Sequence, residues 1–347
     1  VLTAPAMAGT VAYWRFEDGT PGTNIVHSAA NGVFSPDVTD VSGNGNHLSA
    51  WTSEDFAGYR YRDIVAYSKV PLTGAANTLS VKNAGGSPGM FTQTGSAIST
   101  MAPAAFTVEV TCKLENGGYR TIIGRDSYGT VTTGDDINPE LAAFYLQAIP
   151  NNGLAVKYCD VDGYWHDAIS ANNVFQSFDF AANPDGDGIP WYSIAAVSDG
   201  LWLKLYLYNH DHPEEGYVLI AQNDLLNDNP GSTNTALTAG AGDGGDWDAG
   251  NWSVGRGLYN GGHGDRAWGY IDEVRISDSA LLITHFLMGP LPSDPVVDQT
   301  ADMVHTDVDV VLNWNAAGDP NGPVTGNAVA PGIVNPVSYT HLRAHET

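Results

Sequence analysis

A carboxylate on an otherwise apolar strand face is the feature of this sequence that most directly implies chemistry. Read as a β-strand, residues 268–277 direct alternate side chains to opposite faces. One face then carries Tyr270, Asp272, Val274 and Ile276. An ionised aspartate is rarely buried unless it is paired, hydrogen-bonded several times or bound to a metal, and no cation shares this face. The pattern therefore predicts a partner for Asp272, and calcium is the natural candidate in so acidic a protein.

A Gly-rich segment at residues 242–252 combines hydrogen-bond acceptors with an aromatic ring. Neutral carbohydrate is bound by such a mixture of planar acceptors and an aromatic wall. We therefore predict a ligand site made of Asp243, Asp246, Trp247, Asp248 and Asn251. The alternative is an ordinary Gly-rich loop.

The acidic loop at residues 183–191 has the spacing of a calcium loop but not its full ligand set. Asn183, Asp185 and Asp187 suit the first three ligands, yet no acidic residue follows where the bidentate ligand belongs. The favoured interpretation is a solvated Gly-Asp turn. His210 and His212 lack a third ligand nearby in sequence, so we expect them in an exposed loop.

The predicted strand at residues 201–208 alternates leucines with larger side chains. The face opposite the leucines carries Trp202, Lys204, Tyr206 and Tyr208. A row of flat rings can stack on sugars, but aromatic side chains also dominate ordinary sheet packing. We therefore favour packing of this face against loops.

The sequence lacks the pair of catalytic carboxylates that glycan hydrolysis requires. No Glu-x-Asp-x-Glu or Glu-x-Asp-x-x-Glu motif occurs, and the common nucleophile, zinc-protease and phosphate-loop motifs are absent as well. Binding is therefore favoured over catalysis. The alternative is a glycan-cleaving enzyme that uses residues such as Tyr259, His263 and Arg266.

Composition limits the class of protein. The 347 residues include 14 Lys+Arg and 39 Asp+Glu, for a net charge of −25 at pH 7, which opposes nucleic acids and anionic membranes as partners. No run of 18 apolar residues is present, so we expect no membrane insertion. The 40 Gly and 19 Pro separate short β-branched or aromatic runs, which predicts an all-β fold. The expected strands are 11–16, 106–114, 120–124, 142–149, 154–159, 192–197, 201–208, 217–222, 251–255 and 269–277.

The two cysteines leave their redox state open. Cys112 and Cys159 each lie in a predicted strand. Both can be buried thiols, and a disulfide between neighbouring strands is the alternative, because sequence does not show whether their Cα atoms approach closely enough.

The ends of the chain differ from its centre. Residues 1–9 end in Ala6-Met7-Ala8, which resembles the cleavage site of a signal peptide and predicts a secreted or cell-surface protein; an ordinary Ala-rich terminus is the alternative. Residues 10–289 form one predicted β domain, and 290–303 a Pro-rich linker. Residues 304–336 look like the truncated start of an immunoglobulin- or fibronectin-like module, and 337–347 like a read-through tail or a native one. A longer parent protein with further domains is implied.

Four segments, in order, resemble the landmarks of bacterial laminin G-like domains of the concanavalin A-like lectin and glucanase superfamily. They are 12–18 (AYWRFED), 38–48 (VTDVSGNGNHL), 191–200 (WYSIAAVSDG) and 269–276 (GYIDEVRI). The resemblance covers about residues 10–290 and implies a jelly-roll sandwich of two antiparallel sheets.

The resemblance also implies where a structural calcium ion would lie. It places Asp40, Asn46 and Asp272 around the ion, with Glu17 or Asp18 as a further ligand and carbonyls completing the six to eight oxygens that calcium prefers. The alternative is a metal-free loop in which Asp272 accepts from backbone amides. The sequence as a whole favours a carbohydrate-recognition or adhesion domain that binds a neutral polysaccharide or cell-surface glycan.

Overall fold

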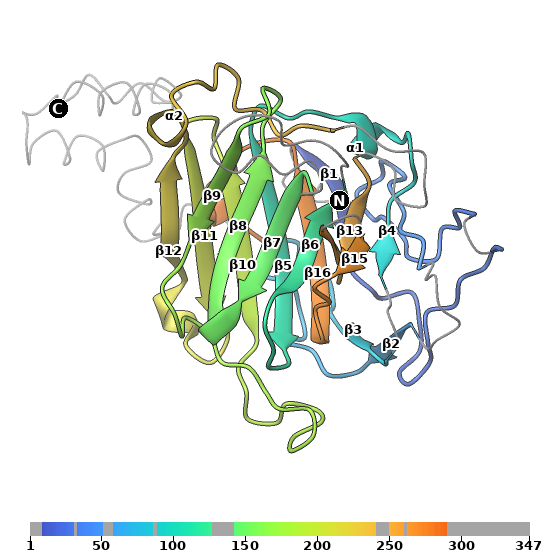
Figure 1. Ribbon diagram of the computed structural model, residues 1–347. Coiled ribbons are helices and arrows are strands. Elements are labelled where there is room, and N and C mark those ends of the chain that lie inside the picture. The colour runs from blue at the N-terminus through green and yellow to red at the C-terminus, as the bar shows by residue number, and fades with distance from the viewer. Residues whose placement is uncertain are drawn as a thin grey trace, which may run out of the picture. The chain divides into compact units, whose positions relative to one another are not determined.

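Two antiparallel sheets face each other in the computed structural model and form an all-β jelly-roll sandwich (Figure 1). The structure describes residues 9–30, 33–50, 58–85, 89–126, 142–240, 250–259 and 262–289. The predicted fold class is confirmed. The terminal segments predicted as signal-peptide remnant, linker, truncated module and tail lie outside the described residues, apart from Gly9, and stay predictions.

The larger sheet has eight strands. Seven follow the order β12 (Tyr217–Asp224), β11 (Trp202–Asn209), β10 (Tyr192–Ser198), β5 (Phe106–Leu114), β16 (Gly269–Ser277), β3 (Ser80–Asn83) and β2 (Tyr59–Arg62). The eighth, β1 (Thr10–Trp14), also pairs with β16. The central strands β5 and β16 have the bounds that the sequence predicted.

The smaller sheet has six strands and lies in front of the larger one in Figure 1. Its order is β4 (Met90–Phe91), β13 (Trp252–Val254), β6 (Arg120–Arg125), β7 (Phe144–Ile149), β8 (Gly153–Cys159) and β9 (Trp165–Ile169). A separate hairpin joins β14 (Gly257–Tyr259) to β15 (Gly262–Gly264). The described helical turns are α1 (Ala97–Thr100), α2 (Leu225–Asp228), η1 (Pro150–Asn152), η2 (Pro213–Glu215) and η3 (Ile283–His285).

The core fills the space between the sheets, because each strand directs alternate apolar side chains inward. Phe106 of β5 meets two rings of the facing sheet edge-on, with ring centroids 5.8 Å from Phe144 and 5.3 Å from Tyr158. Replacing such a buried phenylalanine by alanine typically costs about 3–5 kcal/mol. Phe106 therefore joins the two layers.

A β-bulge in β16 corrects the predicted distribution of its side chains. Asp272 pairs with Thr111 and Arg275 with Glu109, so three steps on β16 match two on β5. Glu273, with φ of 47°, occupies the left-handed region at the extra position. Past this point the alternation is reversed. Ile271, Val274 and Ile276 therefore lie in the core, and Tyr270 belongs to a different cluster, so the prediction of one face holding Tyr270, Asp272, Val274 and Ile276 is wrong.

The two cysteines are free thiols. Cys112 lies on β5 of the larger sheet and Cys159 on β8 of the smaller one, so they do not occupy neighbouring strands. Burial raises the pKa of each thiol to about 12, which keeps both protonated and unreactive at neutral pH.

The outer face of the larger sheet is covered by the segments 63–79 and 278–289. Leu72 and Leu287 join the two segments through a 3.1 Å amide-to-carbonyl hydrogen bond and pack beside Tyr13. Phe286 packs against Tyr206 and Tyr217, with ring centroids 5.7 and 4.9 Å apart. The predicted packing of the aromatic row of β11 against loops is therefore confirmed at Tyr206. In the part of the chain that is described, no helix is long and apolar enough to cross a membrane.

Candidate functional site

The predicted calcium ligand Asp40 is surrounded by hydrogen-bond donors. Its Oδ1 accepts from the amides of Tyr13 and Ser42, each at 2.9 Å. Its Oδ2 accepts from the Ser42 hydroxyl at 2.8 Å and the Asn46 amide at 2.9 Å. The carboxylate therefore closes its own loop onto β1, as an Asx turn does.

The other predicted ligands are also engaged with donors. Asn46 donates from Nδ2 to the Val11 carbonyl at 2.7 Å. Glu17 accepts from the amides of Thr78 and Leu79 at 2.7 and 3.1 Å. Asp272 accepts from Asn77 Nδ2 at 2.8 Å and from the Glu273 amide at 2.9 Å.

These four residues do not form an oxygen cage in the described structure. Across the described ranges, no group of three or more His, Cys, Asp or Glu side chains could hold a metal. The oxygens of Asp40 face amide and hydroxyl donors, whereas a calcium site needs six to eight oxygens that face the ion. We derive no function through calcium, and the ion stays a prediction from the sequence.

Most of the predicted carbohydrate loop lies outside the described residues. Asp243, Asp246, Trp247 and Asp248 lie outside the described residues. Asn251 is 5% exposed and donates from Nδ2 to the Thr94 hydroxyl at 2.8 Å. Its side chain therefore fixes the start of β13, and the loop stays a prediction.

The residues named for an alternative enzyme lie on and after the β14–β15 hairpin. The His263 side chain is fully buried, with Nε2 2.8 Å from Oδ2 of the equally buried Asp126. A general acid or base must reach the proton that it transfers, so this burial favours a structural role. His210 differs from the prediction of an exposed loop, because its ring stacks on Tyr67 at 5.2 Å and meets the Ser193 hydroxyl at 2.9 Å.

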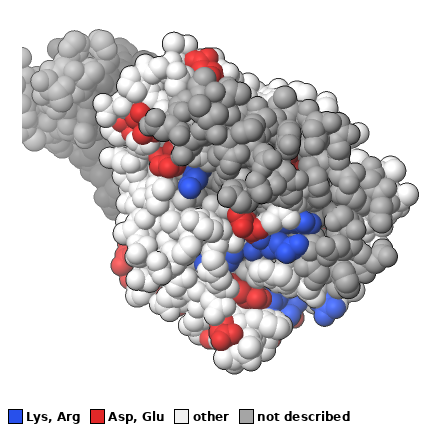
Figure 2. All heavy atoms as spheres, in the orientation of Figure 1, with Lys and Arg blue, Asp and Glu red and all other residues white. Residues whose placement is uncertain are grey.

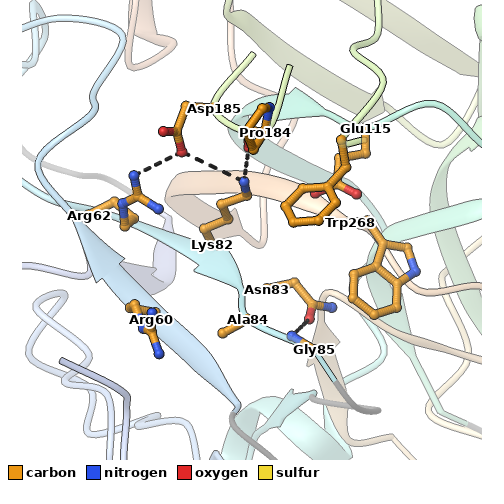
Figure 3. Close-up of a pocket in the computed structure, with 11 residues that line it drawn as sticks. Arg60, Arg62, Lys82, Asn83, Ala84, Gly85, Glu115, Pro184, Asp185 and Trp268 are labelled. Atoms are coloured by element: carbon orange, nitrogen blue, oxygen red, sulfur yellow. Dashed lines mark hydrogen bonds and ion pairs between the residues drawn. The ribbon is translucent and has the colours of Figure 1, made fainter. Parts of the chain in front are cut away.

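A pocket of about 590 Å³ opens where β2, β3 and the loop at 178–188 meet (Figure 3). This volume is within the range of small-molecule sites. Its lining combines three cations, two carboxylates and two aromatic rings with small residues of the strand end. These residues are Arg60, Arg62, Lys82, Asn83, Ala84, Gly85, Glu115, Phe180, Pro184, Asp185 and Trp268.

The cations of the pocket form a row across the strands. Arg60 on β2 pairs with Lys82 on β3, Lys82 with Tyr270 on β16, and Tyr270 with Lys113 on β5. Paired residues of antiparallel strands lie side by side on one face, and like charges there repel each other. The Tyr270 ring lies between the two lysines, with Nζ atoms 5.0 and 5.1 Å from its centroid. On the face shown in Figure 2, several Lys and Arg lie in one group with Asp and Glu beside them.

The loop at 178–188 covers part of this row with backbone oxygens. Lys82 donates to the Pro184 carbonyl, and Lys113 donates to the carbonyls of Asp185 and Gly186, each at 3.1 Å. Asp185 accepts from Arg62 at 2.9 Å and from the Tyr270 hydroxyl at 2.8 Å. The loop therefore neutralises one end of the row.

The predicted Gly-Asp turn is confirmed within that loop. Asn183 Nδ2 donates to the Asp187 carbonyl, and the Asp187 amide donates back to Asn183 Oδ1, both at 2.9 Å. The sequence did not reveal that Asp185 faces the sheet, because its partners lie more than 80 residues away in the chain.

Electrostatics in the pocket follow from burial and pairing. Burial lowers the pKa of Lys82, while Glu115 and Asp185 oppose this effect. Burial raises the pKa of Glu115, opposed by Lys82. The hydrogen bond from Tyr270 lowers the pKa of Asp185, although burial acts against it. Of the two carboxylates, Asp185 is therefore the one whose ionised form is more strongly stabilised.

Several donors of the pocket have no acceptor among the described residues. Asn83 is 4% exposed; its Oδ1 accepts from the Gly85 amide at 3.0 Å, while Nδ2 has no partner. Arg60 uses only Nε, which donates to Asn24 at 3.0 Å, and Arg62 uses only one Nη. Among the described residues, only Nδ2 of Asn83 in this group is a buried donor without an acceptor, which costs about 1–3 kcal/mol, whereas the guanidinium of Arg60 is exposed and open to a ligand.

Sequence reasoning missed this site. Its one local signal is the run Tyr59-Arg60-Tyr61-Arg62, which sets two of only 14 basic residues on one strand face. Lys82 and Trp268 come together with that strand only through pairing over long sequence distances.

Comparisons with known proteins assign this chain to no family. No family model matches the chain, and no curated protein matches it. Among solved structures, the sialidase CBM40 of Ruminococcus gnavus matches with a TM-score of 0.37 and 14% identity over 55% of this chain and 85% of that one. A crystal structure described as HCR/D-Sa-GBL1/C matches with a TM-score of 0.46 and 11% identity, over 81% of this chain and 51% of that one.

A third similar structure is the enzymatically active domain of tailspike protein 2 of bacteriophage CBA120. Its TM-score is 0.42 and its identity 10%, over 69% of this chain and 31% of that one. The chain thus spans about half or less of two of these three structures. Identities this low concern the fold alone, and the site must be interpreted from its own residues.

Proposed function

We propose that this domain is a glycan-binding module and that its ligand lies in the 590 Å³ pocket between β2, β3 and the loop at 178–188. One observation carries the proposal: aromatic rings and unsatisfied donors line the same concave site. Trp268 offers a planar surface for the apolar face of a sugar ring, and Arg60 and Arg62 offer donors to its oxygens. Carbohydrate recognition needs both at once.

The finer predictions from the sequence belong to the same proposal. A laminin G-like module of a secreted or cell-surface protein, with a role in recognition or adhesion, suits such a pocket. The expectation of a neutral glycan depends on the acidic composition of the chain and on Trp247, which lies outside the described residues. The pocket and the Trp247 loop are therefore tested together.

The test is affinity electrophoresis of the purified protein in a panel of soluble polysaccharides, with an assay for new reducing ends. We expect retardation without new ends. Trp268→Ala should abolish the retardation, because loss of a stacked aromatic removes a large share of the contact area. Trp202→Ala, at a tryptophan that is 36% exposed and outside the pocket, should leave it unchanged.

Three results would change the proposal. Retardation that survives Trp268→Ala and is lost in Trp247→Ala moves the site to the Gly-rich loop. New reducing ends that disappear in His263→Ala support the enzyme alternative. Absence of retardation in the whole panel contradicts the glycan-binding proposal.

A further inference from the structure

We propose that the pocket selects a sugar that carries an oxyanion, either a carboxylate or a sulfate ester, over the same sugar without it. This inference deepens the proposed function and rests on it. The charges of the pocket lining favour an anionic ligand, whereas the acidic composition of the whole chain favours a neutral one.

The charge of the pocket lining is opposite in sign to the net charge of the protein. The lining holds three cations and two carboxylates, in a chain whose net charge is −25. Of the two carboxylates, Asp185 is already held by Arg62 and by the Tyr270 hydroxyl. A local positive site in so acidic a protein marks a position where an anion is bound, because the surrounding field disfavours anions everywhere else.

The cation row is incompletely neutralised. At its inner end, Lys113 and Lys82 donate to carbonyls of the loop at 178–188. At its outer end, Arg60 lies opposite Lys82 on the neighbouring strand, and within the described structure its terminal nitrogens meet no acceptor. Asp185 Oδ1 lies 3.9 Å from Lys82 Nζ and partly offsets the repulsion between the two cations, which leaves the charge of Arg60 without a carboxylate partner in the described structure.

The free donors fit an oxyanion better than a hydroxyl. A guanidinium presents parallel N–H groups that match two oxygens of a carboxylate or sulfate, and such charge-assisted hydrogen bonds are roughly twice as strong as neutral ones. Within the described structure, both Nη atoms of Arg60 and one Nη of Arg62 meet no acceptor. A neutral sugar accepts hydrogen bonds from the same donors, but these bonds lack the added attraction between opposite charges.

The arrangement in Figure 3 separates the two contacts that such a ligand needs. Arg60 and Arg62 lie on the β2 side, Trp268 lies on the opposite side, and Asn83, Ala84 and Gly85 lie between them. Ala84 and Gly85 have little or no side chain, so the sugar ring can approach the strand end. The ring then rests on Trp268 while its acidic group points to the arginines.

The experiment compares matched pairs of short oligosaccharides by isothermal titration at fixed ionic strength. One pair is hexagalacturonate and its fully methyl-esterified form. The other is one galacto-oligosaccharide with and without O-sulfate groups. We expect the acidic member of at least one pair to bind about tenfold or more tightly than its neutral partner, which corresponds to about 1.4 kcal/mol. The pair that responds distinguishes carboxylate from sulfate.

Variants locate the effect. Arg60→Gln and Arg62→Gln should each remove most of the preference for the acidic member, so that the two members of the responding pair bind about equally. Lys204→Gln, at an exposed lysine of β11 paired with Asp199, removes the same charge outside the pocket and should change the binding of neither. Circular dichroism and the melting temperature confirm that each variant is folded.

The failures of the two proposals can be told apart. Equal binding of both members of each pair, still lost in Trp268→Ala, overturns the oxyanion inference and leaves the glycan-binding proposal standing. A preference that survives Arg60→Gln and Arg62→Gln also overturns the inference. Absence of binding to all four probes overturns both.

Discussion

Two regions on the outer face of the larger sheet contain charged side chains and treat them in opposite ways. The closed region consists of Arg15, Asn77, Glu109, Asp272, Glu273 and Arg275. The open region consists of Arg60, Arg62, Lys82 and Asn83 at the pocket. Both are carried by paired strands of one sheet, so the difference lies in what covers them.

In the closed region nearly every charge meets an opposite charge or a hydrogen-bond partner within the chain. Arg275 donates from Nε to Glu109 at 2.6 Å, and the other oxygen of Glu109 accepts from the Leu287 amide at 2.7 Å. Arg15 contacts Glu273 at 2.8 Å. These pairs are covered by the segments 63–79 and 278–289.

In the open region, the donors exceed the acceptors and no covering segment is described over Arg60. Charges that are satisfied within the chain stabilise the fold, whereas exposed donors without an acceptor in the chain are available to a ligand. The closed region therefore has a structural role, and the open region is the one to which the proposed function assigns binding.

The largest effect is expected from breaking the closed region. Arg275→Met leaves Glu109 buried without its counter-ion, which should lower the free energy of unfolding by about 3–5 kcal/mol in urea denaturation. Arg62→Met breaks an ion pair in the open region whose side chains are 26% and 41% exposed, and should cost less than about 1 kcal/mol. Similar losses in the two variants would remove the contrast between the regions.

The next largest effect on stability is expected from calcium. Its presence or absence shows whether an ion or hydrogen bonds hold the loop near Asp40. If the prediction from the sequence holds, calcium at a hundredfold excess over Kd adds about 2.7 kcal/mol to stability, and a chelator lowers the melting temperature. Scanning calorimetry with and without chelator measures this. A melting temperature that ignores the chelator while Asp272→Ala still lowers it contradicts the calcium prediction and leaves the hydrogen bonds as the explanation.

Protonation of Asp272 should make the closed region sensitive to pH. Burial, then the neighbouring Glu273, raises the pKa of Asp272 well above its usual range. The native state therefore binds the proton more tightly than the unfolded chain. The stabilisation is fully present below the unfolded pKa of about 3.9 and is lost as pH rises through the folded pKa.

The matched variant is Asp272→Asn, which keeps the shape and cannot ionise. Relative to the wild type, its unfolding free energy should improve as the pH rises from about 4 to about 8, by about 1 kcal/mol or more. The buried Oδ1 of Asn77 has no partner in the described structure and can accept from a protonated neighbour. Parallel stability curves for the two proteins would contradict a raised pKa.

The smallest effect on stability is expected at Arg60. Its charge lies opposite Lys82 and its one hydrogen bond, to Asn24, is exposed, so Arg60→Gln should change the unfolding free energy by no more than about 0.5 kcal/mol. Thermal denaturation checks this. A large loss would place Arg60 among the structural charges and not in the open region.

The sequence predicted the long central strands and missed the short ones. Phe106–Leu114 and Gly269–Ser277 have the predicted bounds because nine residues of β-forming sequence give a strong local signal. Strands β2 and β3 have four residues each and lie between the predicted strands at 11–16 and 106–114, where the sequence predicted none. Their identity as strands depends on pairing with β16, which no local pattern reveals.

The candidate site was missed for the same physical reason. Its residues come from β2, β3, the loop at 178–188 and the residue before β16, and each is unremarkable within its own segment. The sequence correctly identified Asp272 as a residue that needs partners. It did not identify Asn77, which is 195 positions away in the chain.

The bulge at Glu273 has a consequence for anyone who aligns or redesigns this strand. Deleting that one residue would restore strict alternation across β16. Val274 and Ile276 would still face the apolar interior and Arg275 would still face outward, because the extra residue is what offsets the two halves of the strand. A one-residue gap at this position in an alignment therefore marks the point where the inward and outward alternation of the strand shifts by one residue. A hydrophobic period of two that is scored across the whole strand will cancel between its two halves.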